Sequence, residues 1–98
     1  MRTRKYAVKQ DANHAAIING LRKLGYAVLD LKSLGGGAPD ILVTKSLSPA
    51  STQLWGWLVE IKTDKGTLNA KQKKWRENWT GPQPITARSL KELLELIR

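Results

Sequence analysis

The sequence contains no cysteine and no phenylalanine, and its single histidine is His14. Without cysteine the chain can form no disulfide bond and no zinc–thiolate site, which fits a reducing compartment, and we expect a cytoplasmic protein. No apolar run approaches the roughly 18 residues that a membrane-spanning helix requires. The basic first ten residues are followed by no apolar signal segment, so secretion is not expected either.

Acidic residues are also scarce, since 8 Asp and Glu stand against 17 Lys and Arg, and the formal net charge is +9. Such an excess on 98 residues indicates a polyanionic partner, and nucleic acid is the leading candidate. A membrane surface would require a basic amphipathic helix with a large apolar face, and we expect no membrane association. A small basic protein that binds no nucleic acid remains the alternative.

Hydrophobic periodicity and turn residues predict one α/β domain over residues 1–98, with a mixed sheet flanked by helices and no internal linker. Asp11 is expected to cap a helix over 12–24, after a mobile basic arm over 1–10. The other expected elements are strands over 26–31, 40–45, 54–62 and 84–87, a helix over 69–79 and a last helix capped by Ser89.

Two stripes are expected along the first helix. The stripe that should face the core contains His14, Ile17, Ile18 and Leu21. The second stripe contains the small residues Ala12, Ala16 and Gly20, against which another element or a second subunit could pack closely. A lone histidine on such a face is expected to be a core residue in preference to a metal ligand.

The strands over 40–45 and 54–62 carry two carboxylates that a hairpin would bring together. If the strands pair across the 46–53 loop so that the numbers of paired residues sum to 100, Asp40 lies opposite Glu60. Cross-strand neighbours have Cβ atoms about 4.5–5.5 Å apart, and two carboxylates that close repel each other unless a cation lies between them. The pattern therefore predicts a site for a hard divalent cation such as Mg²⁺.

Lys62 lies on the same strand face as Glu60, two residues further on. A metal ion and a lysine beside two carboxylates suit phosphodiester hydrolysis, because both stabilise negative charge on the phosphate. The glycine loop before Asp40, which includes Gly36 and Gly37, would let a nucleic-acid backbone approach. The plainer interpretation makes Asp40 a turn residue and the Glu60–Lys62 strand a solvated edge.

The motifs "PD" at 39–40 and "EIK" at 60–62 resemble those of the PD-(D/E)XK nuclease superfamily. The longer stretches "DANHAAIINGLRKLGYAV", "GGGAPDILV" and "LVEIKTDKGTLNAKQKKW" resemble the VRR-NUC domain family, especially its short stand-alone members from phages and prophages. The resemblance covers residues 11–90. It implies a restriction-endonuclease-like αβββαβ core with a C-terminal helix, and a homodimer similar to Holliday-junction resolvases.

The resemblance also implies an activity and the residues that perform it. The activity is Mg²⁺- or Mn²⁺-dependent cleavage of DNA, structure-specific for branched DNA such as a Holliday junction, with no small-molecule cofactor. Asp40, Glu60 and the backbone carbonyl of Ile61 would be the metal ligands, and Lys62 the catalytic lysine. Gln72 matches the family's glutamine, although Asn69-x-x-Gln72 also reads as a capping box.

The chain departs from the family pattern at two points. Ala16 stands where family members often carry a glutamate on the first helix, and the Val-Arg-Arg triplet is absent, with only Arg88 as a candidate. A non-catalytic nucleic-acid-binding module of the same fold, and a general DNA-nicking nuclease, therefore remain alternatives. A basic interaction subunit that binds no nucleic acid would leave the Gly-Pro-Asp loop unexplained.

The basic residues around the proposed site are expected to contact phosphates in preference to forming only a solvated face. Trp75 and Trp79 lie one helical turn apart and are expected to be core residues in preference to base-stacking ones. The candidate nucleic-acid-binding residues are Gly36, Gly37, Lys65, Lys71, Lys73 and Lys74.

Overall fold

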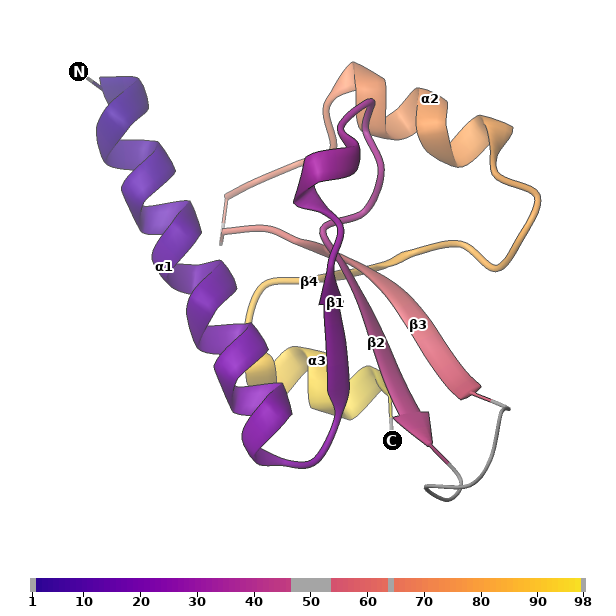
Figure 1. The fold of residues 1–98 in the computed structure, drawn as a ribbon. Coiled ribbons are helices and arrows are strands. Elements are labelled where there is room, and N and C mark those ends of the chain that lie inside the picture. The colour runs from indigo at the N-terminus through magenta and orange to yellow at the C-terminus, as the bar shows by residue number, and fades with distance from the viewer. Residues whose placement is uncertain (1, 47–53, 64, 98) are drawn as a thin grey trace.

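The structure is a computed structural model that describes residues 2–46, 54–63 and 65–97. Most of the 46–53 loop expected between two strands lies outside the described residues. The elements along the chain are α1 (Arg2–Lys23), β1 (Ala27–Asp30), the 3₁₀ turn η1 (Lys32–Leu34), β2 (Ile41–Ser46), β3 (Leu54–Ile61), α2 (Ala70–Asn78), β4 (Ile85–Ala87) and α3 (Leu90–Ile97). The expected α/β composition, with helices around a sheet and a helix at the C-terminal end, is confirmed (Figure 1).

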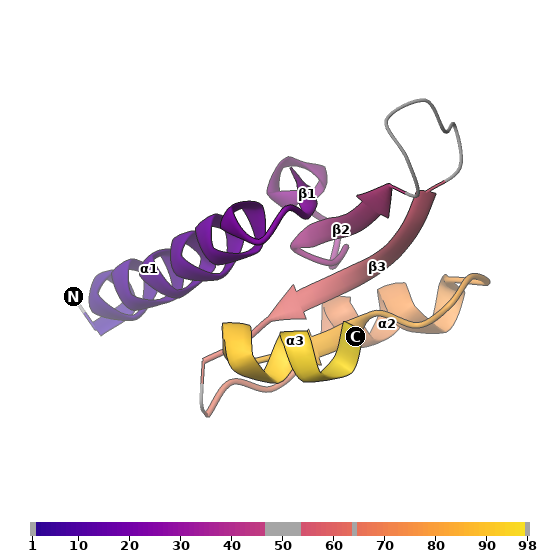
Figure 2. The same ribbon diagram turned by 90° about the horizontal axis from the view of Figure 1, so that it is seen from below.

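The four strands form one mixed sheet in the order β1-β2-β3-β4. Strand β2 is antiparallel to both β1 and β3, and β4 is parallel to β3. Strands β2 and β3 pair from Ile41↔Val59 to Ser46↔Leu54, so the numbers of every pair sum to 100, as predicted. Figures 1 and 2 both show that the Ser46–Leu54 end of this pair lies away from α1.

The prediction that Asp11 begins the first helix is wrong, because α1 begins at Arg2 and includes most of the expected mobile arm. Residues 2–10 contain no proline or glycine and include several good helix formers. A residue with a capping side chain begins a helix only where the residues before it are not helical themselves. Asp11 therefore lies inside α1. The helix ends at Lys23, close to where it was predicted to end, and Gly25 follows it in a left-handed conformation (φ 93°).

The hydrophobic core lies between one face of the sheet and two helices, α1 and α3. The expected core face of α1 is confirmed, since Ile17 and Leu21 are fully buried and Ile18 packs against them. Figure 1 shows α1 and α3 on one side of the strands and α2 on the other. The buried apolar residues are Ile17, Leu21, Ile41, Val43, Val59, Ile61, Ala87, Leu93 and Ile97.

Gly20, at the end of the small-residue stripe, packs directly against Leu90 of α3, where a Cβ atom would collide with the leucine side chain. This part of the stripe is an intramolecular contact, whereas Ala12 and Ala16 are exposed. Of the helices in the described part of the chain, none combines the length and the apolar character that crossing a bilayer requires.

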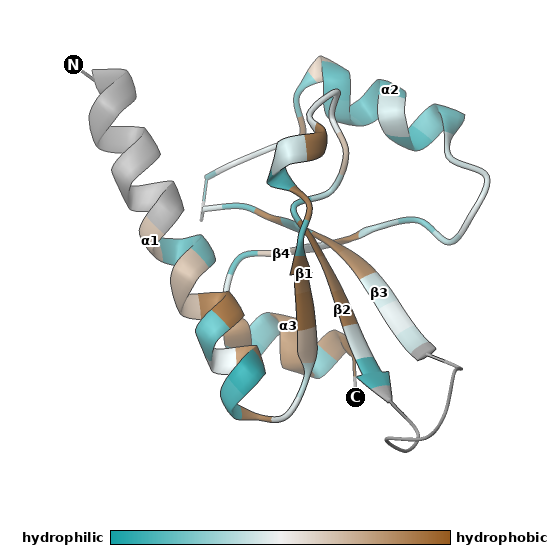
Figure 3. Cartoon of the chain, in the orientation of Figure 1, coloured by the Kyte–Doolittle hydropathy of each residue, from teal (hydrophilic) through white to brown (hydrophobic). Residues whose placement is uncertain are grey.

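Helix α2 differs from α1 and α3 because it buries none of its side chains. Its surface is largely hydrophilic, in contrast to the apolar strands beside it (Figure 3). The prediction that Trp75 and Trp79 belong to the core is therefore wrong: Trp75 is half-buried and Trp79 is 39% exposed. The predicted start of α2 is confirmed by a capping box between Asn69 and Gln72. At α3 the cap is also present, since the Glu92 N–H donates to Ser89 Oγ.

Candidate active site

Asp40 stands immediately before β2 and is bound to β3 on both sides of Glu60. Its N–H donates to the carbonyl oxygen of Val59 at 3.0 Å. Its Oδ2 accepts from the N–H of Ile61 at 2.7 Å. Main chain and side chain together therefore fix the Asp40 carboxylate beside Glu60, as the register predicts.

Glu60 is 2% exposed, on the sheet face opposite the α1–α3 core, and its carboxyl group forms a hydrogen bond with that of Asp40. Burial raises the pKa of Glu60 from 4.5 to about 8, and the hydrogen bond and negative charge of Asp40 add to the rise. The positive charges of Lys62 and Arg76 act in the opposite direction. The folded protein therefore favours the protonated form of Glu60 more than an exposed glutamate would, and a bound cation would oppose this.

Lys62 follows β3 directly and is 6% exposed. Its Nζ lies 4.0 Å from Glu60 Oε2 and donates to Gln72 Oε1 at 2.9 Å. Its backbone N–H donates to the carbonyl of Ala87 in β4 at 3.0 Å. The ammonium group is thus positioned beside the carboxylate pair from two directions, by the sheet and by α2.

Gln72 completes the predicted capping box and also contacts the proposed catalytic lysine. Its Oε1 accepts from the Asn69 N–H at 2.9 Å, and its own N–H donates to Asn69 Oδ1, which completes the capping box. The same Oε1 also accepts from Lys62 Nζ. The start of α2 and the orientation of the lysine therefore depend on one amide oxygen.

Two polar residues of α1 that sequence reasoning did not assign to the site are also present. His14 is 3% exposed, and its Nε2 lies 3.7 Å from Asp40 Oδ2. Asn13 Nδ2 donates to the carbonyl of Lys62 at 3.3 Å and to that of Arg88 at 3.5 Å. The sequence contained one indication that these residues have a role: Asn13 and His14 are adjacent polar residues next to a helix face that is otherwise apolar.

Ala16, the position at which the resemblance places a glutamate, does not lie on the same side of α1 as His14. Two residues along a helix correspond to a rotation of about 200°. Ala16 is exposed, whereas His14 is buried against Asp40. The side chain of α1 that approaches Asp40 is therefore the imidazole of His14.

The glycine loop adopts a conformation that only glycine takes readily, with positive φ at Gly35 (62°), Gly36 (65°) and Gly37 (87°). Gly37 packs directly against the backbone of Lys71 in α2, so its lack of a side chain serves packing within the chain. Gly36 faces open space. Of the two glycines expected to admit nucleic acid, only Gly36 is placed to do so.

The lysines expected to contact phosphates lie at the surface around this loop. Lys71, Lys73 and Lys74 are exposed on α2, and Lys65 is exposed in the turn after β3. The two arginines nearby have internal partners. Arg76 donates to the carbonyl of Pro84 and to Thr86 Oγ1, and Arg88 donates to the carbonyl of Gly66.

The site offers two carboxylates to a cation. Among the described residues no group of three or more histidine, cysteine, aspartate or glutamate side chains is arranged to hold a metal ion. Zn²⁺ sites use three or four protein ligands, whereas Mg²⁺ is commonly bound by one or two carboxylates together with water and substrate phosphate oxygens. The pair therefore fits Mg²⁺ or Mn²⁺, with the carbonyl of Ile61 at the adjacent position of β3.

Comparison of the chain with protein-family models, with curated protein sequences and with solved structures finds no match in any of the three. The function of this small α/β domain is therefore inferred from its own residues. These are a half-buried Asp40 paired with a buried Glu60, a buried lysine beside them, and exposed lysines on the neighbouring helix.

Proposed function

We propose that the protein is a divalent-metal-dependent endodeoxyribonuclease with a restriction-endonuclease-like core. One observation carries the proposal: Lys62 Nζ lies 4.0 Å from Glu60 Oε2, and Glu60 in turn is hydrogen-bonded to Asp40. Burying a carboxylate and a lysine together, with a second carboxylate against them, costs stability, and such groups are concentrated at functional sites. The net charge of +9 favours a polyanionic substrate.

A bound Mg²⁺ or Mn²⁺ would supply charge neutralisation at the scissile phosphate and a water of lowered pKa. The residues of the chain then have separate tasks. Asp40 and Glu60 supply the carboxylate oxygens, and the carbonyl of Ile61 is the third proposed ligand. The N–H of Ile61 keeps the Asp40 carboxylate from rotating.

Lys62 is the proposed catalytic cation. Its ammonium group lies next to the carboxylates, where it would stabilise the negative charge that develops on the phosphate in the transition state. Gln72 orients this ammonium group through one hydrogen bond and leaves further N–H donors of the lysine for the substrate. Gln72 is accordingly a positioning residue in this proposal.

The proposed substrate is branched DNA, and the proposed assembly is a homodimer. Phosphate contacts from the exposed lysines give affinity without selectivity, whereas two active sites at a fixed spacing select a branched geometry. Because Gly20 packs against Leu90, the small-residue stripe is not a free surface along its whole length. The end of the β2–β3 pair, where Trp55 is 63% exposed, is the better candidate for the dimer contact.

A non-catalytic nucleic-acid-binding module is the second candidate, and the absence of a third acidic or histidine ligand within the described residues favours it. A plasmid-nicking assay with Mg²⁺, Mn²⁺ or EDTA distinguishes the two. We expect nicking with either metal and none with EDTA. Asp40→Asn and Glu60→Gln should each abolish it, whereas Glu95→Gln, at an exposed site on α3, should not.

Binding without nicking under every metal condition would leave the binding module as the function. If nicking survives in both Asp40→Asn and Glu60→Gln, the carboxylate pair is not the active site. Calorimetry with Mn²⁺ on the same variants gives an independent measurement, because it reports metal binding without a requirement for turnover.

A further inference from the structure

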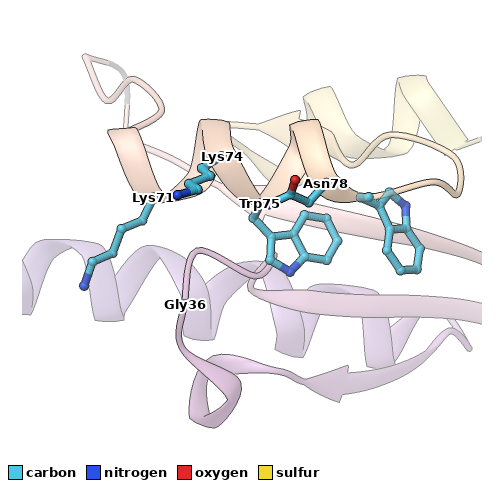
Figure 4. A pocket seen from close by; sticks show the side chains of 6 residues that line it. Gly36, Lys71, Lys74, Trp75 and Asn78 are labelled. Carbon is cyan, nitrogen blue, oxygen red and sulfur yellow. The ribbon is translucent and has the colours of Figure 1, made fainter.

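A cavity of about 390 Å³ lies between the glycine loop and α2, beside the proposed active site. Figure 4 shows Trp75 pointing from α2 toward the Gly36 loop, with Lys71 and Lys74 on the same helix. The volume lies within the range of about 300–1,000 Å³ that is typical of small-ligand pockets. The lining residues are Gly36, Lys71, Lys74, Trp75, Asn78 and Trp79.

The aromatic wall of this pocket is held in place by the chain itself. The rings of Trp75 and Trp79 stack with centroids 5.1 Å apart and an interplanar angle of 19°. Trp79 Nε1 donates to the carbonyl of Pro82 at 2.8 Å, and Gly81 lies so close to the Trp79 ring that a Cβ atom would collide with it. The contacts with Pro82 and Gly81 therefore hold the Trp79 ring in place, and the Trp75 ring extends the stack toward the pocket.

The rest of the lining is cationic and sterically open. Lys71 and Lys74 are exposed and have no acidic partner among the described interactions, in which Lys62 and His14 form the ion pairs. Gly36, on the opposite wall, has no neighbouring atom within 4 Å of the position where a Cβ atom would lie. A planar aromatic surface flanked by mobile positive charges is the combination that binds single-stranded nucleic acid.

We propose that this pocket binds one unpaired nucleobase of a DNA strand, stacked on Trp75, while Lys71 and Lys74 contact the flanking phosphates. The proposal rests on the proposed function in that DNA is the substrate. Lys71 directly precedes Gln72, which contacts the catalytic lysine, so the strand held at the pocket continues toward the carboxylate pair. The protein would thus select branched DNA with unpaired nucleotides next to the cleaved bond.

The test compares two branched duplexes of equal charge under EDTA, by fluorescence anisotropy. One carries a short single-stranded flap with bases and the other the same flap made of abasic nucleotides. We expect the wild-type protein to bind the flap with bases about tenfold more tightly, which is the scale of one stacking interaction. Trp75→Ala should remove this difference, and Trp75→Phe should retain most of it.

Four further variants separate stacking from charge and from loss of fold. Lys71→Ala together with Lys74→Ala should weaken both flap duplexes equally and lower the salt dependence of binding. Gly36→Asn should fill the pocket mouth and abolish the preference for bases, because asparagine tolerates a φ near 65°. Leu96→Ala and Lys91→Ala, both at exposed sites of α3, are the controls and should bind like the wild type.

Equal binding of the two flaps by the wild-type protein would overturn the proposal, and so would an undiminished preference in both Trp75→Ala and Gly36→Asn. Equal loss of affinity for both flaps in Trp75→Ala would also overturn it, because a general change in α2 would then be the cause. These outcomes are separate from the nicking assay, since a nuclease without a base pocket would still nick plasmid. A base pocket on a non-catalytic module would still discriminate between the flaps.

Discussion

At the scale of single residues, the carboxylate pair links stability to pH. The pKa of Glu60 is about 8 in the metal-free folded protein and 4.5 as its ordinary value, so the folded state binds the proton more tightly. The stabilisation is complete below about pH 4.5 and is lost as the pH rises through 8. We expect the urea midpoint to fall over this range, and the fall to be smaller in Glu60→Gln. An unchanged slope in Glu60→Gln would contradict the assignment, and Glu95→Gln should behave like the wild type.

Lys62 has the most direct prediction for activity. Lys62→Ala should keep Mn²⁺ binding and lower the cleavage rate by at least about a hundredfold, which is the scale of one lost transition-state donor. Single-turnover cleavage and calorimetry on the same preparation measure the two properties. Lys91→Ala is the matched control, because Lys91 is exposed on α3 and belongs neither to the proposed site nor to the candidate DNA-binding residues. Similar rates for the two variants would make Lys62 only a buried structural charge.

His14 is a positioning residue for the Asp40 carboxylate in this description, through the 3.7 Å approach of its Nε2. His14→Ala should weaken Mn²⁺ binding by about 10- to 100-fold, the range typical of residues that orient metal ligands. His14→Gln should restore part of the affinity, which a purely structural role would not explain. Ala16→Glu is the control on the exposed side of α1 and should leave Mn²⁺ affinity unchanged. Tighter binding in Ala16→Glu would show that position 16 reaches the site.

At the scale of elements, the contact between the glycine loop and α2 determines where the helix lies. Gly37→Ala should destabilise the fold by about 1–3 kcal/mol through backbone strain, with a further loss from collision with the Lys71 backbone. Gly36 also has a positive φ, but no atom lies near the position of its Cβ. Gly36→Ala should therefore lose stability through backbone strain alone. Equal urea midpoints for the two variants would indicate that α2 does not pack tightly against the loop.

The strands were more predictable from the sequence than the helices. Alternation of apolar and polar side chains assigns Val59 and Ile61 to the buried face of the sheet, and the register given by the hairpin places Asp40 beside Glu60. The start of α1 was predicted wrongly because the residues before Asp11 also favour a helix. A capping residue at position 11 therefore does not begin the helix. No sequence pattern states that a helix continues beyond its amphipathic part.

The site was predicted in part for the same reason. Glu60 lies in β3, Asp40 directly precedes β2 and Lys62 directly follows β3, so strand geometry relates their positions directly. His14 reaches the site only through the packing of α1, which depends on contacts far apart in the sequence. Trp75 and Trp79 have the spacing of a core stripe, but α2 lies at the edge of the molecule and leaves them at the surface.

At the scale of the whole molecule, a net charge of +9 predicts strong binding to any duplex at low salt. A homodimer with two sites should bind a four-way junction in preference to linear duplex, and the preference should increase between about 50 and 200 mM salt as nonspecific phosphate contacts weaken. Light scattering gives the mass, and competition gel shifts at both salt concentrations give the preference. A monomer that binds the two DNAs equally would leave a general nicking nuclease.

The hydrogen bond from the Lys62 N–H to Ala87 has a consequence for the protein during its synthesis. Strand β4 is made after α2, so Lys62 acquires this backbone partner only when most of the chain has left the ribosome. An incomplete chain would attract DNA through its charge but would lack the arrangement that the proposed cleavage requires. For the proposed nuclease, the order of the strands would then delay activity until folding is nearly complete.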